Sequence, residues 1–214
     1  MTKVILRLHL LSATTFGRGD GVAGLVDGEI EHTPEEGFPF LRGRALKGLL
    51  REAAEDVAFA LGWPDNDARL QFLFGKEGSG LDTSGKLHVS DAHLPSNLRA
   101  LLRQGIKDQE LTKDEVFAAL TGIRRQTAMN VYGGPQRASL RAMRVVLRKV
   151  VLEAELTFTK EPEPQQWALL AGAVLALRAA GTGRNRGRGR VQATLWVNGA
   201  DVTREKFNLL KGGD

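Results

Sequence analysis

The sequence has no cysteine and few aromatic residues, and each shortage excludes a class of protein. Without cysteine in its 214 residues, the chain can form neither a disulfide framework nor a thiolate metal site. Aromatic residues make up 6% of the chain, with no RNP-type aromatic pair, which argues against an ordinary sequence-reading RRM domain. The lack of cysteine also suits a cytoplasmic protein.

Long hydrophobic runs are missing as well. The most apolar stretch, residues 167–177, is far shorter than the roughly 20 residues that span a bilayer. The start, MTKVILRLHLLS, lacks a small-residue cleavage signal and is predicted to be a strand rather than a signal peptide. With 42% hydrophobic and 26% charged residues, we expect a soluble, cytoplasmic globular protein with no membrane partner.

Charge is unevenly distributed along the chain. Residues 20–36 hold six acidic side chains and no Lys or Arg, whereas residues 122–150 hold seven basic side chains and no Asp or Glu. A merely solvated surface usually mixes the two signs. The net charge is +5, and the basic segment therefore favours a phosphate backbone as its partner. The acidic segment could bind a metal or dock onto the basic segment of a neighbouring copy.

Hydrophobic periodicity predicts an α+β chain. Period-two alternation predicts strands over 3–11, 86–94, 143–158 and 191–197. Helical spacing predicts helices over 41–62, 66–74, 95–104, 112–120 and 161–180. This order fits a ferredoxin-like (RRM-like) core with long insertions, one of them helical, although such a core serves many unrelated functions.

The stretch GTGRNRGRGR, residues 181–190, allows three interpretations: a disordered RNA-binding tail, a solvated loop, or an ordered turn at a phosphate chain. Because it lies between a predicted helix and a predicted strand, we expect an ordered turn. Gly181 or Gly183 would then follow the helix as its terminal glycine. In an extended segment, arginines spaced by two would all project to one side.

A second basic group lies at the start of the predicted helix in FPFLRGRALKGLLRE. Arg44, Lys47 and Arg51 share one helix face, near free amide groups that attract phosphate. The alternative is an ordinary solvated face. Gly43 and Gly48 favour the first interpretation, since glycine is costly inside a helix unless another backbone approaches closely.

Four motifs in order resemble those of the RAMP superfamily of CRISPR-associated proteins. They are GFPFLRGRALKGLLRE, LFGKEGSG followed by GKLHVSDAHL, RRQTAMN followed by GGPQRASLRAMRVVL, and GTGRNRGRGRV. The chain looks most like the backbone-forming subunit of type III effector complexes. The resemblance implies one RNA-binding domain over residues 1–214, with insertions at about 12–40, 63–121 and 122–142, the last a thumb-like hairpin.

The resemblance also implies RNA contacts. The helix start would contact guide phosphates, the hairpin would wedge into the guide–target duplex, and the glycine-rich loop would lie near the guide. The implied RNA-binding residues are Arg44, Lys47, Arg51, Arg124, Arg125, Met129, Tyr132, Arg137, Arg141, Arg184, Arg186 and Arg188. Val131 is a further apolar side chain available for wedging.

Type III backbone subunits cut with an aspartate in the loop after the first strand, and Asp20 and Asp27 are the candidates here. Asp27 fits the family position better. The resemblance implies that it binds a divalent cation, Mg²⁺ or Mn²⁺, or assists attack by a ribose 2′-hydroxyl. A lone carboxylate is an incomplete metal site, so RNA or other acids would supply ligands. Alternatively, both aspartates only shape glycine-rich turns.

The function expected from the resemblance is guide-RNA binding in an antiviral type III CRISPR effector, with hydrolytic endonuclease activity on the paired target RNA. The expected partners are guide RNA, target RNA, other effector subunits and further copies of the chain. Two alternatives remain open: a structural RNA-binding subunit without cutting, and a guide-processing endoribonuclease.

Overall fold

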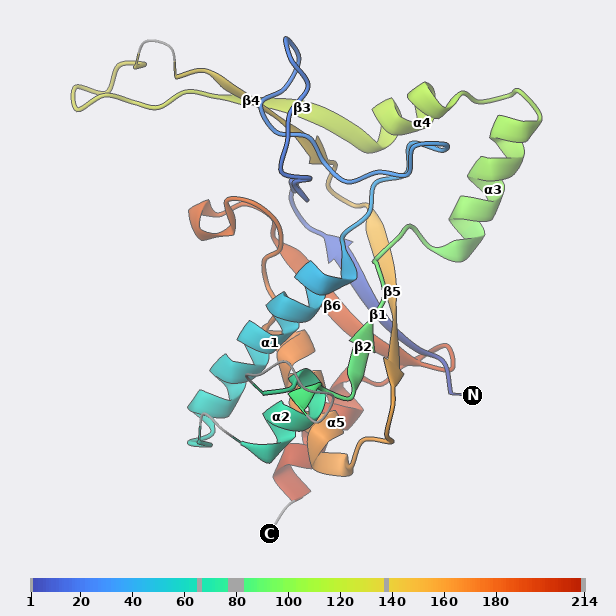
Figure 1. Ribbon diagram of the computed structural model, residues 1–214, viewed down its shortest axis with the longest axis vertical. Coiled ribbons are helices and arrows are strands. Elements are labelled where there is room, and N and C mark those ends of the chain that lie inside the picture. Colours follow the sequence, from blue (N-terminus) through green and yellow to red (C-terminus); the bar gives the residue numbers. More distant parts are fainter. Residues whose placement is uncertain (1, 65–66, 77–82, 137–138, 213–214) are drawn as a thin grey trace.

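The computed structural model describes residues 2–64, 67–76, 83–136 and 139–212. Within them, helices and strands are interspersed along the chain (Figure 1). The elements are β1 (Val4–Leu10), α1 (Gly43–Ala60), α2 (Ala68–Phe74), β2 (Leu87–Val89), α3 (Ser96–Lys107), α4 (Lys113–Leu120), β3 (Thr121–Gln126), β4 (Arg141–Val146), β5 (Val151–Phe158), α5 (Pro164–Ala176), β6 (Val191–Val197), β7 (Ala200–Asp201) and α6 (Thr203–Asn208), with 3₁₀ turns at Arg184–Arg186 and Leu209–Gly212.

The central sheet of the described residues has the strand order β2-β5-β1-β6-β7, and all neighbouring strands are antiparallel. The connection from β1 through α1 and α2 reaches β2, which lies beyond β5. The connection from β5 through α5 reaches β6, which lies beyond β1. Two split β-α-β units thus interlock as in a ferredoxin-like core, and the predicted fold class is confirmed.

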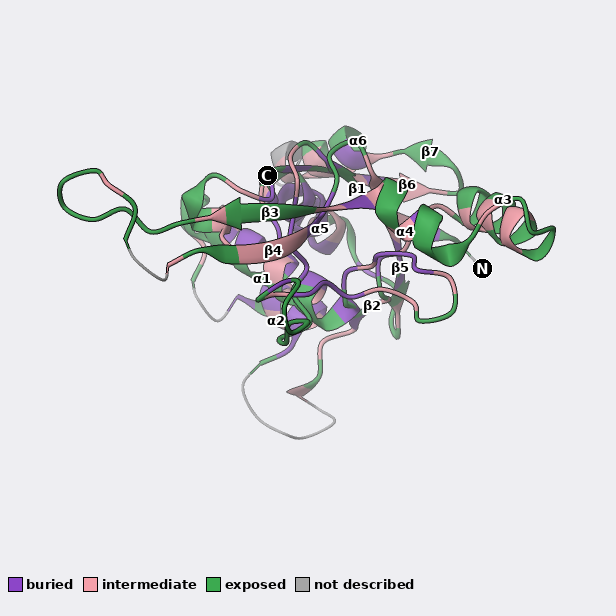
Figure 2. Ribbon diagram, turned by 90° about the horizontal axis from the view of Figure 1, so that it is seen from above, coloured by how far each residue is buried: buried purple, intermediate pink, exposed green. Residues whose placement is uncertain are grey.

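The two faces of the sheet differ because side chains alternate along each strand. One face of β1 is fully apolar, and α1 and α5 cover it with buried residues such as Leu46 and Leu50 (Figures 1 and 2). The other face is polar: Arg7 pairs with Glu153 at 2.8 Å and lies 4.0 Å from the centre of the Trp196 ring. The core therefore lies between the sheet and these two helices.

Strands β3 and β4 form a separate hairpin that projects from the body of the molecule (Figures 1 and 2). They pair antiparallel from Thr121 opposite Val146 to Gln126 opposite Arg141. The single strand predicted over 143–158 is therefore wrong, because its two halves belong to different sheets. The turn between them places Lys149 at a φ of +73°, a conformation that the alternating sequence does not reveal.

The acidic segment packs against the base of this hairpin within the same chain. Gly28 forms a parallel bridge with Met143, and the Arg144 amide donates to the Gly28 carbonyl at 2.9 Å. Beside it, the Arg144 guanidinium pairs with the buried Glu29 carboxylate at 2.8 Å. A buried pair of this kind fixes the loop, because removing either partner would leave an uncompensated charge.

In the part of the chain that the structure describes, no helix is both long enough and apolar enough to cross a membrane.

Candidate nucleic-acid interface

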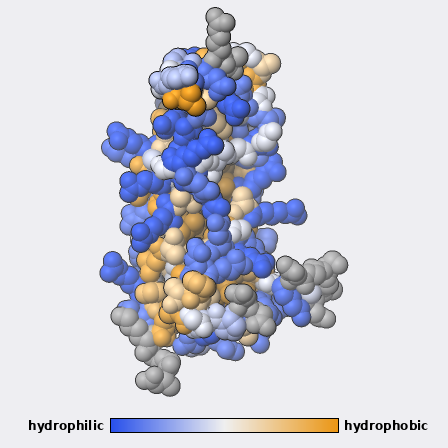
Figure 3. Space-filling model, turned by 90° about the vertical axis from the view of Figure 1, so that its left-hand side faces the viewer, coloured by the Kyte–Doolittle hydropathy of each residue, from blue (hydrophilic) through white to orange (hydrophobic). Residues whose placement is uncertain are grey.

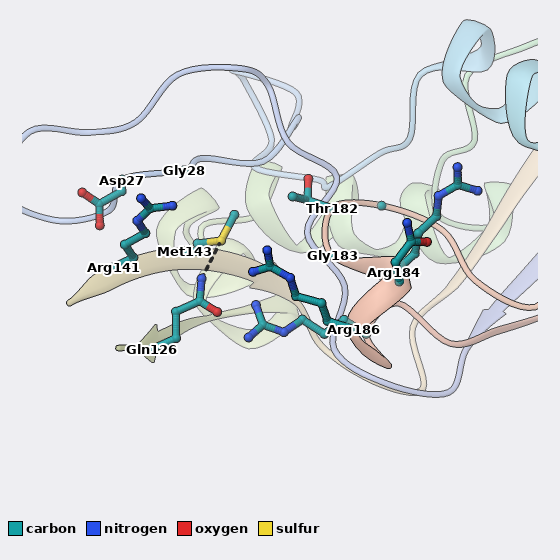
Figure 4. Close-up of a pocket in the computed structure, with 12 residues that line it drawn as sticks. Asp27, Gly28, Gln126, Arg141, Met143, Thr182, Gly183, Arg184 and Arg186 are labelled. Carbon is teal, nitrogen blue, oxygen red and sulfur yellow. Dashed lines mark hydrogen bonds between the residues drawn. The ribbon is translucent and has the colours of Figure 1, made fainter. Parts of the chain in front are cut away.

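A cavity of about 700 Å³ lies where the hairpin base, the acidic segment and the glycine–arginine loop meet (Figure 4). We call it the cleft. Figure 4 shows Asp27 and Arg141 at one side, and Arg186 reaching toward Gln126 and Met143. The lining residues are Asp27, Gly28, Gln126, Arg141, Met143, Gly181, Thr182, Gly183, Arg184, Asn185, Arg186 and Arg188. Three segments far apart in the sequence thus form one site.

The loop that forms one wall of the cleft is an ordered turn, as expected, but it is not extended. Helix α5 ends at Ala176, so neither Gly181 nor Gly183 is its terminal glycine, and that prediction is wrong. A single 3₁₀ turn over Arg184–Arg186 is bracketed by Gly183 and Gly187, both in the left-handed region. The backbone changes direction at these two glycines, whereas an extended segment had been predicted.

Close backbone approach fixes both ends of the loop. A Cβ atom on Gly181 would lie 2.5 Å from the Thr15 carbonyl oxygen, and one on Gly189 would lie 1.9 Å from that of Ala180. Both glycines also have positive φ angles. The loop therefore requires glycine at its ends for packing within the protein.

The arginines of this loop point in different directions, so the prediction that they share one side is wrong. Arg184 turns toward α1 and pairs with Glu52 at 2.7 Å. Arg186 and Arg188 line the cleft, while Arg190 lines a separate groove at β6. The 3₁₀ turn causes this divergence, because its period of three does not keep alternate residues on one face.

The cleft concentrates positive charge without matching acids. Arg141, Arg186 and Arg188 line the cleft and form no salt bridge within the described residues, and neither does Arg124, whose charge acts on Arg188. Burial lowers the pKa of Arg188, and the like charges of Arg124 and Arg186 lower it further. Such crowding is unfavourable for the protein alone, and an anion in the cleft would relieve it.

Asp27 contributes the carboxylate of the cleft. Its backbone amide donates to the Ala142 carbonyl at 2.7 Å, and its Oδ2 accepts from the Ala142 amide at 2.7 Å. Asp20, the other candidate, is paired through both carboxylate oxygens with Arg18. That hydrogen bond lowers the pKa of Asp20. Of the two, Asp27 is the one placed among the cleft arginines.

The donor atoms of the cleft do not fit a resident metal. No group of three or more His, Asp or Glu side chains that could hold a metal occurs among the described residues. Asp27 is accompanied by arginines, which repel a cation. Among the residues that line the cleft, Asp27 is the one acidic side chain, so a cation there would need further ligands from outside this lining.

At the start of α1, one of the expected free amide groups is bonded within the chain. The Gly43 amide donates to the carboxylate of Asp91, in the SDA motif, at 2.7 Å, and phosphate contact by the other amides stays a prediction. A Cβ atom on Gly43 would lie 2.3 Å from the Val89 carbonyl oxygen. The close approach that this glycine permits is thus to β2 and the residues that follow it. For Gly48, nothing lies within 4 Å, and the structure gives no reason for glycine there.

The three cations of α1 have different surroundings. The Lys47 ammonium donates to the Leu87 carbonyl at 2.7 Å, and burial lowers its pKa. Arg51 pairs with Glu55 one turn along the helix at 2.7 Å. Arg44 is exposed and forms no salt bridge within the described ranges. Contact of all three with RNA stays a prediction. Of the three, Arg44 is the one whose charged group has no partner within the described residues.

The hairpin tip exposes apolar side chains to solvent. Val131 and Tyr132 are 92% and 93% exposed, and Met129 is 62% exposed. Figure 3 shows an apolar patch among hydrophilic residues at the end of the molecule that carries the hairpin. Arg125 lies exposed on β3. Arg137, also predicted to bind RNA, lies outside the described residues.

Sequence reasoning missed several polar residues of the cleft. Gln126 on β3 contacts Met143 through its amide nitrogen, 3.6 Å from the sulfur atom, and both line the cleft. Thr182 and Asn185 line it from the loop. Their only signal was position within the RRQT and GTGRNR motifs, which marks a segment but not the direction of a side chain.

Known proteins share the family and the fold of this chain. The family model of the RAMP superfamily matches residues 8–192. No curated protein matches the sequence. A chain in the cryo-EM structure of Type III-B Cmr-beta bound to cognate target RNA is 11% identical, with a TM-score of 0.63 over 96% of this chain and 98% of that one. A chain of Type III-B Cmr-beta in the apo state is also 11% identical, with a TM-score of 0.64 over 91% and 97%. At this identity the likeness is one of fold.

Proposed function

The chain belongs to the RAMP superfamily, and on that premise we propose that it is a guide-RNA-binding backbone subunit of a type III CRISPR effector complex. In this proposal it also cuts the target RNA paired with the guide, as an endoribonuclease centred on Asp27. Its partners are the two RNAs, other effector subunits and further copies of itself, assembled in the cytoplasm.

The observation that carries the proposal is the unbalanced charge of the cleft. Arg141, Arg186 and Arg188 come from two separate segments and have Asp27 as the single carboxylate lining the cleft, and the charge of Arg124 acts on Arg188 as well. Arginines held together for structural reasons alone would need acidic partners, because uncompensated buried charge is unfavourable. A phosphate backbone carries one negative charge per nucleotide, so successive phosphates could pair with several of these arginines.

The surroundings of the cleft suit an RNA path. From the cleft, RNA would pass the exposed Arg44, with Lys47 and Arg51 nearby as weaker contacts, since both have partners within the fold. The exposed tip residues Val131 and Tyr132 would press into the guide–target duplex, as apolar wedges do when they unstack bases.

Asp27 and its neighbours suit cleavage by the RNA's own 2′-hydroxyl. The 2′-oxygen attacks the adjacent phosphorus while its proton passes to the carboxylate or solvent, and the bond from phosphorus to the 5′-oxygen breaks as that oxygen takes a proton from solvent. The products are a 2′,3′-cyclic phosphate and a 5′-hydroxyl. Arg141 lies beside Asp27 in Figure 4, where its charge would stabilise the phosphorane. The expected Mg²⁺ or Mn²⁺ would take its other ligands from RNA, and no step here depends on it.

The test compares Asp27→Asn with Asp20→Asn, using a labelled target paired to the bound guide. Asn at position 27 can still accept from the Ala142 amide, so the loop keeps its anchor while the charge is lost. We expect cleavage by this variant to slow by at least about 100-fold with target binding unchanged. Asp20→Asn should keep its rate, because Asp20 pairs with Arg18.

Other outcomes distinguish the alternatives. Normal cutting by Asp27→Asn would refute the assignment of the catalytic residue. Tight guide binding with no cutting by the wild type would favour the structural subunit. Cutting of a guide precursor in place of the target would favour the guide-processing enzyme. The same assays with and without EDTA test the expected dependence on a divalent cation.

A further inference from the structure

A groove beside β6, near the β7 edge of the central sheet, takes no part in the proposed RNA path. It has a volume of about 660 Å³ and lies along β6, between the end of α5 and α6. We call it the edge groove. Its lining residues are Leu11, Leu175, Leu177, Arg178, Arg190, Val191, Gln192, Ala193, Thr194, Asp201, Thr203, Arg204 and Glu205.

In the described part of the chain, the first half of β6 has no partner strand on its outer side, and its outward groups at Val191 and Leu195 are bonded within the chain. Strand β7 pairs only with Trp196 and Val197, at the far end (Figure 2). Val191 and Leu195 direct their amides away from β1, since these donate to the Arg178 carbonyl and the Thr203 hydroxyl. Ala193 between them must therefore also direct its N–H and C=O away from β1.

These outward groups of Ala193 have no protein partner within the described residues, although Ala193 is only 5% exposed. Buried backbone groups are nearly always paired. An N–H and a C=O side by side on one residue are the pair that an antiparallel strand exchanges with its neighbour. The edge thus offers one narrow hydrogen-bonded pair to an incoming extended peptide.

The walls of the groove define the side chains that such a peptide would carry. Arg178, Arg190 and Arg204 are exposed and form no salt bridge in the described segments, so acidic residues would complement them. Leu11 and Leu175 are 45% and 39% exposed and offer an apolar contact. A strand presents alternate side chains to opposite sides, so acidic and apolar residues would alternate.

Peptide suits this groove better than RNA. Asp201 and Glu205 lie among the arginines and would repel a continuous phosphate backbone, whereas a peptide can place neutral residues beside them. The sugar–phosphate backbone of RNA also lacks the N–H and C=O of one residue, the pair that Ala193 would exchange with a peptide. We infer that the edge groove binds an extended acidic–apolar segment of a partner protein, whose backbone exchanges one pair of hydrogen bonds with Ala193 of β6. This inference is independent of RNA binding at the cleft.

The test uses a fluorescein-labelled peptide of alternating Glu and Val, about ten residues long as in longer natural strands, measured by fluorescence anisotropy. We expect it to bind, and the version with Lys in place of Glu to bind at least about tenfold more weakly, since charge-assisted contacts are lost. N-methylation of alternate residues, which blocks strand pairing, should weaken binding by a similar factor.

Protein variants locate the site. Ala193→Pro removes the outward N–H at an edge position where proline is tolerated. The double variant Arg178→Glu, Arg204→Glu reverses the charge of two arginines that line the edge groove. Either change should weaken peptide binding at least about tenfold, whereas Arg148→Glu, an exposed arginine on the turn after β4, should not. RNA binding at the cleft reports that each variant is folded.

Three results would overturn the inference. The first is a peptide affinity that stays the same when Glu is replaced by Lys or when the N-methyl groups are added. The second is unchanged peptide binding by the charge-reversed variant. The third is single-stranded RNA that competes with the peptide and depends on Arg178 and Arg204, which would make the edge groove a nucleic-acid site.

Discussion

The start of α1 and the glycine–arginine loop are both rich in basic residues, yet the fold uses them differently. On α1, Lys47 bonds to the Leu87 carbonyl and Arg51 to Glu55. In the loop, Arg186 and Arg188 line the cleft with no acidic partner among the described residues, and their mutual repulsion helps lower the pKa of Arg188. Positive charge alone therefore does not identify a binding surface; the cleft differs because its arginines line one cavity together without acidic partners in the described residues.

The largest effect should come from breaking the loop that holds the cleft arginines. Gly189→Ala places a Cβ atom 1.9 Å from the Ala180 carbonyl oxygen at a φ of +65°, so the backbone must move. We expect the free energy of unfolding to fall by about 3 kcal/mol, and RNA affinity to fall with it. Urea denaturation and RNA titration measure the two effects.

Gly187→Ala is the matched control, because it has nearly the same φ but nothing within 4 Å. We expect Gly187→Ala to lower the free energy of unfolding by only about 1 kcal/mol. Equal losses in the two variants would mean that left-handed strain alone, and not close packing on Ala180, determines the loop.

The next effect would sharpen the role of α1. Lys47→Met keeps the aliphatic stem but leaves the buried Leu87 carbonyl without its donor, so we expect a loss of about 1 kcal/mol in the free energy of unfolding. The salt dependence of RNA binding should change little, because the Lys47 ammonium faces β2. A large change in salt dependence with no loss of stability would place Lys47 among the RNA contacts.

The smallest effect on stability should come from the hairpin tip. Val131→Ser and Tyr132→Ser alter side chains that are more than nine-tenths exposed, so unfolding should shift by no more than about 0.5 kcal/mol. If the tip wedges into the duplex, these variants should nevertheless change the pattern of cut sites on a paired target. An unchanged pattern on a sequencing gel would argue against the wedge.

Much of the fold could be predicted from the sequence, because period-two alternation and helical spacing follow directly from burial of one face. The strand at 191–197 and the helix predicted over 41–62 are examples, with α1 found at Gly43–Ala60. The boundary between β4 and β5 could not be predicted, because the alternation continues across a turn in which Lys149 has a positive φ.

The site could be predicted only as segments. The acidic loop, the basic hairpin and the glycine–arginine loop meet within one chain, whereas the charges of the first two had suggested docking between neighbouring copies. The directions of individual side chains could not be predicted: Arg184 reaches Glu52 on α1, and Asp91 caps α1 from a motif 48 residues away. Both depend on tertiary contacts that no local pattern encodes.

The most direct test of the central claim is the salt dependence of guide-RNA affinity for the Arg186→Ala, Arg188→Ala double variant, with Arg51→Ala as the control. If the cleft arginines neutralise phosphates, affinity should fall, and the slope of log affinity against log salt should shrink by about 1.4, or about 0.7 per lost single-strand contact. Arg51→Ala should keep nearly the wild-type slope. An unchanged slope in the double variant, or a larger change in Arg51→Ala, would contradict the account.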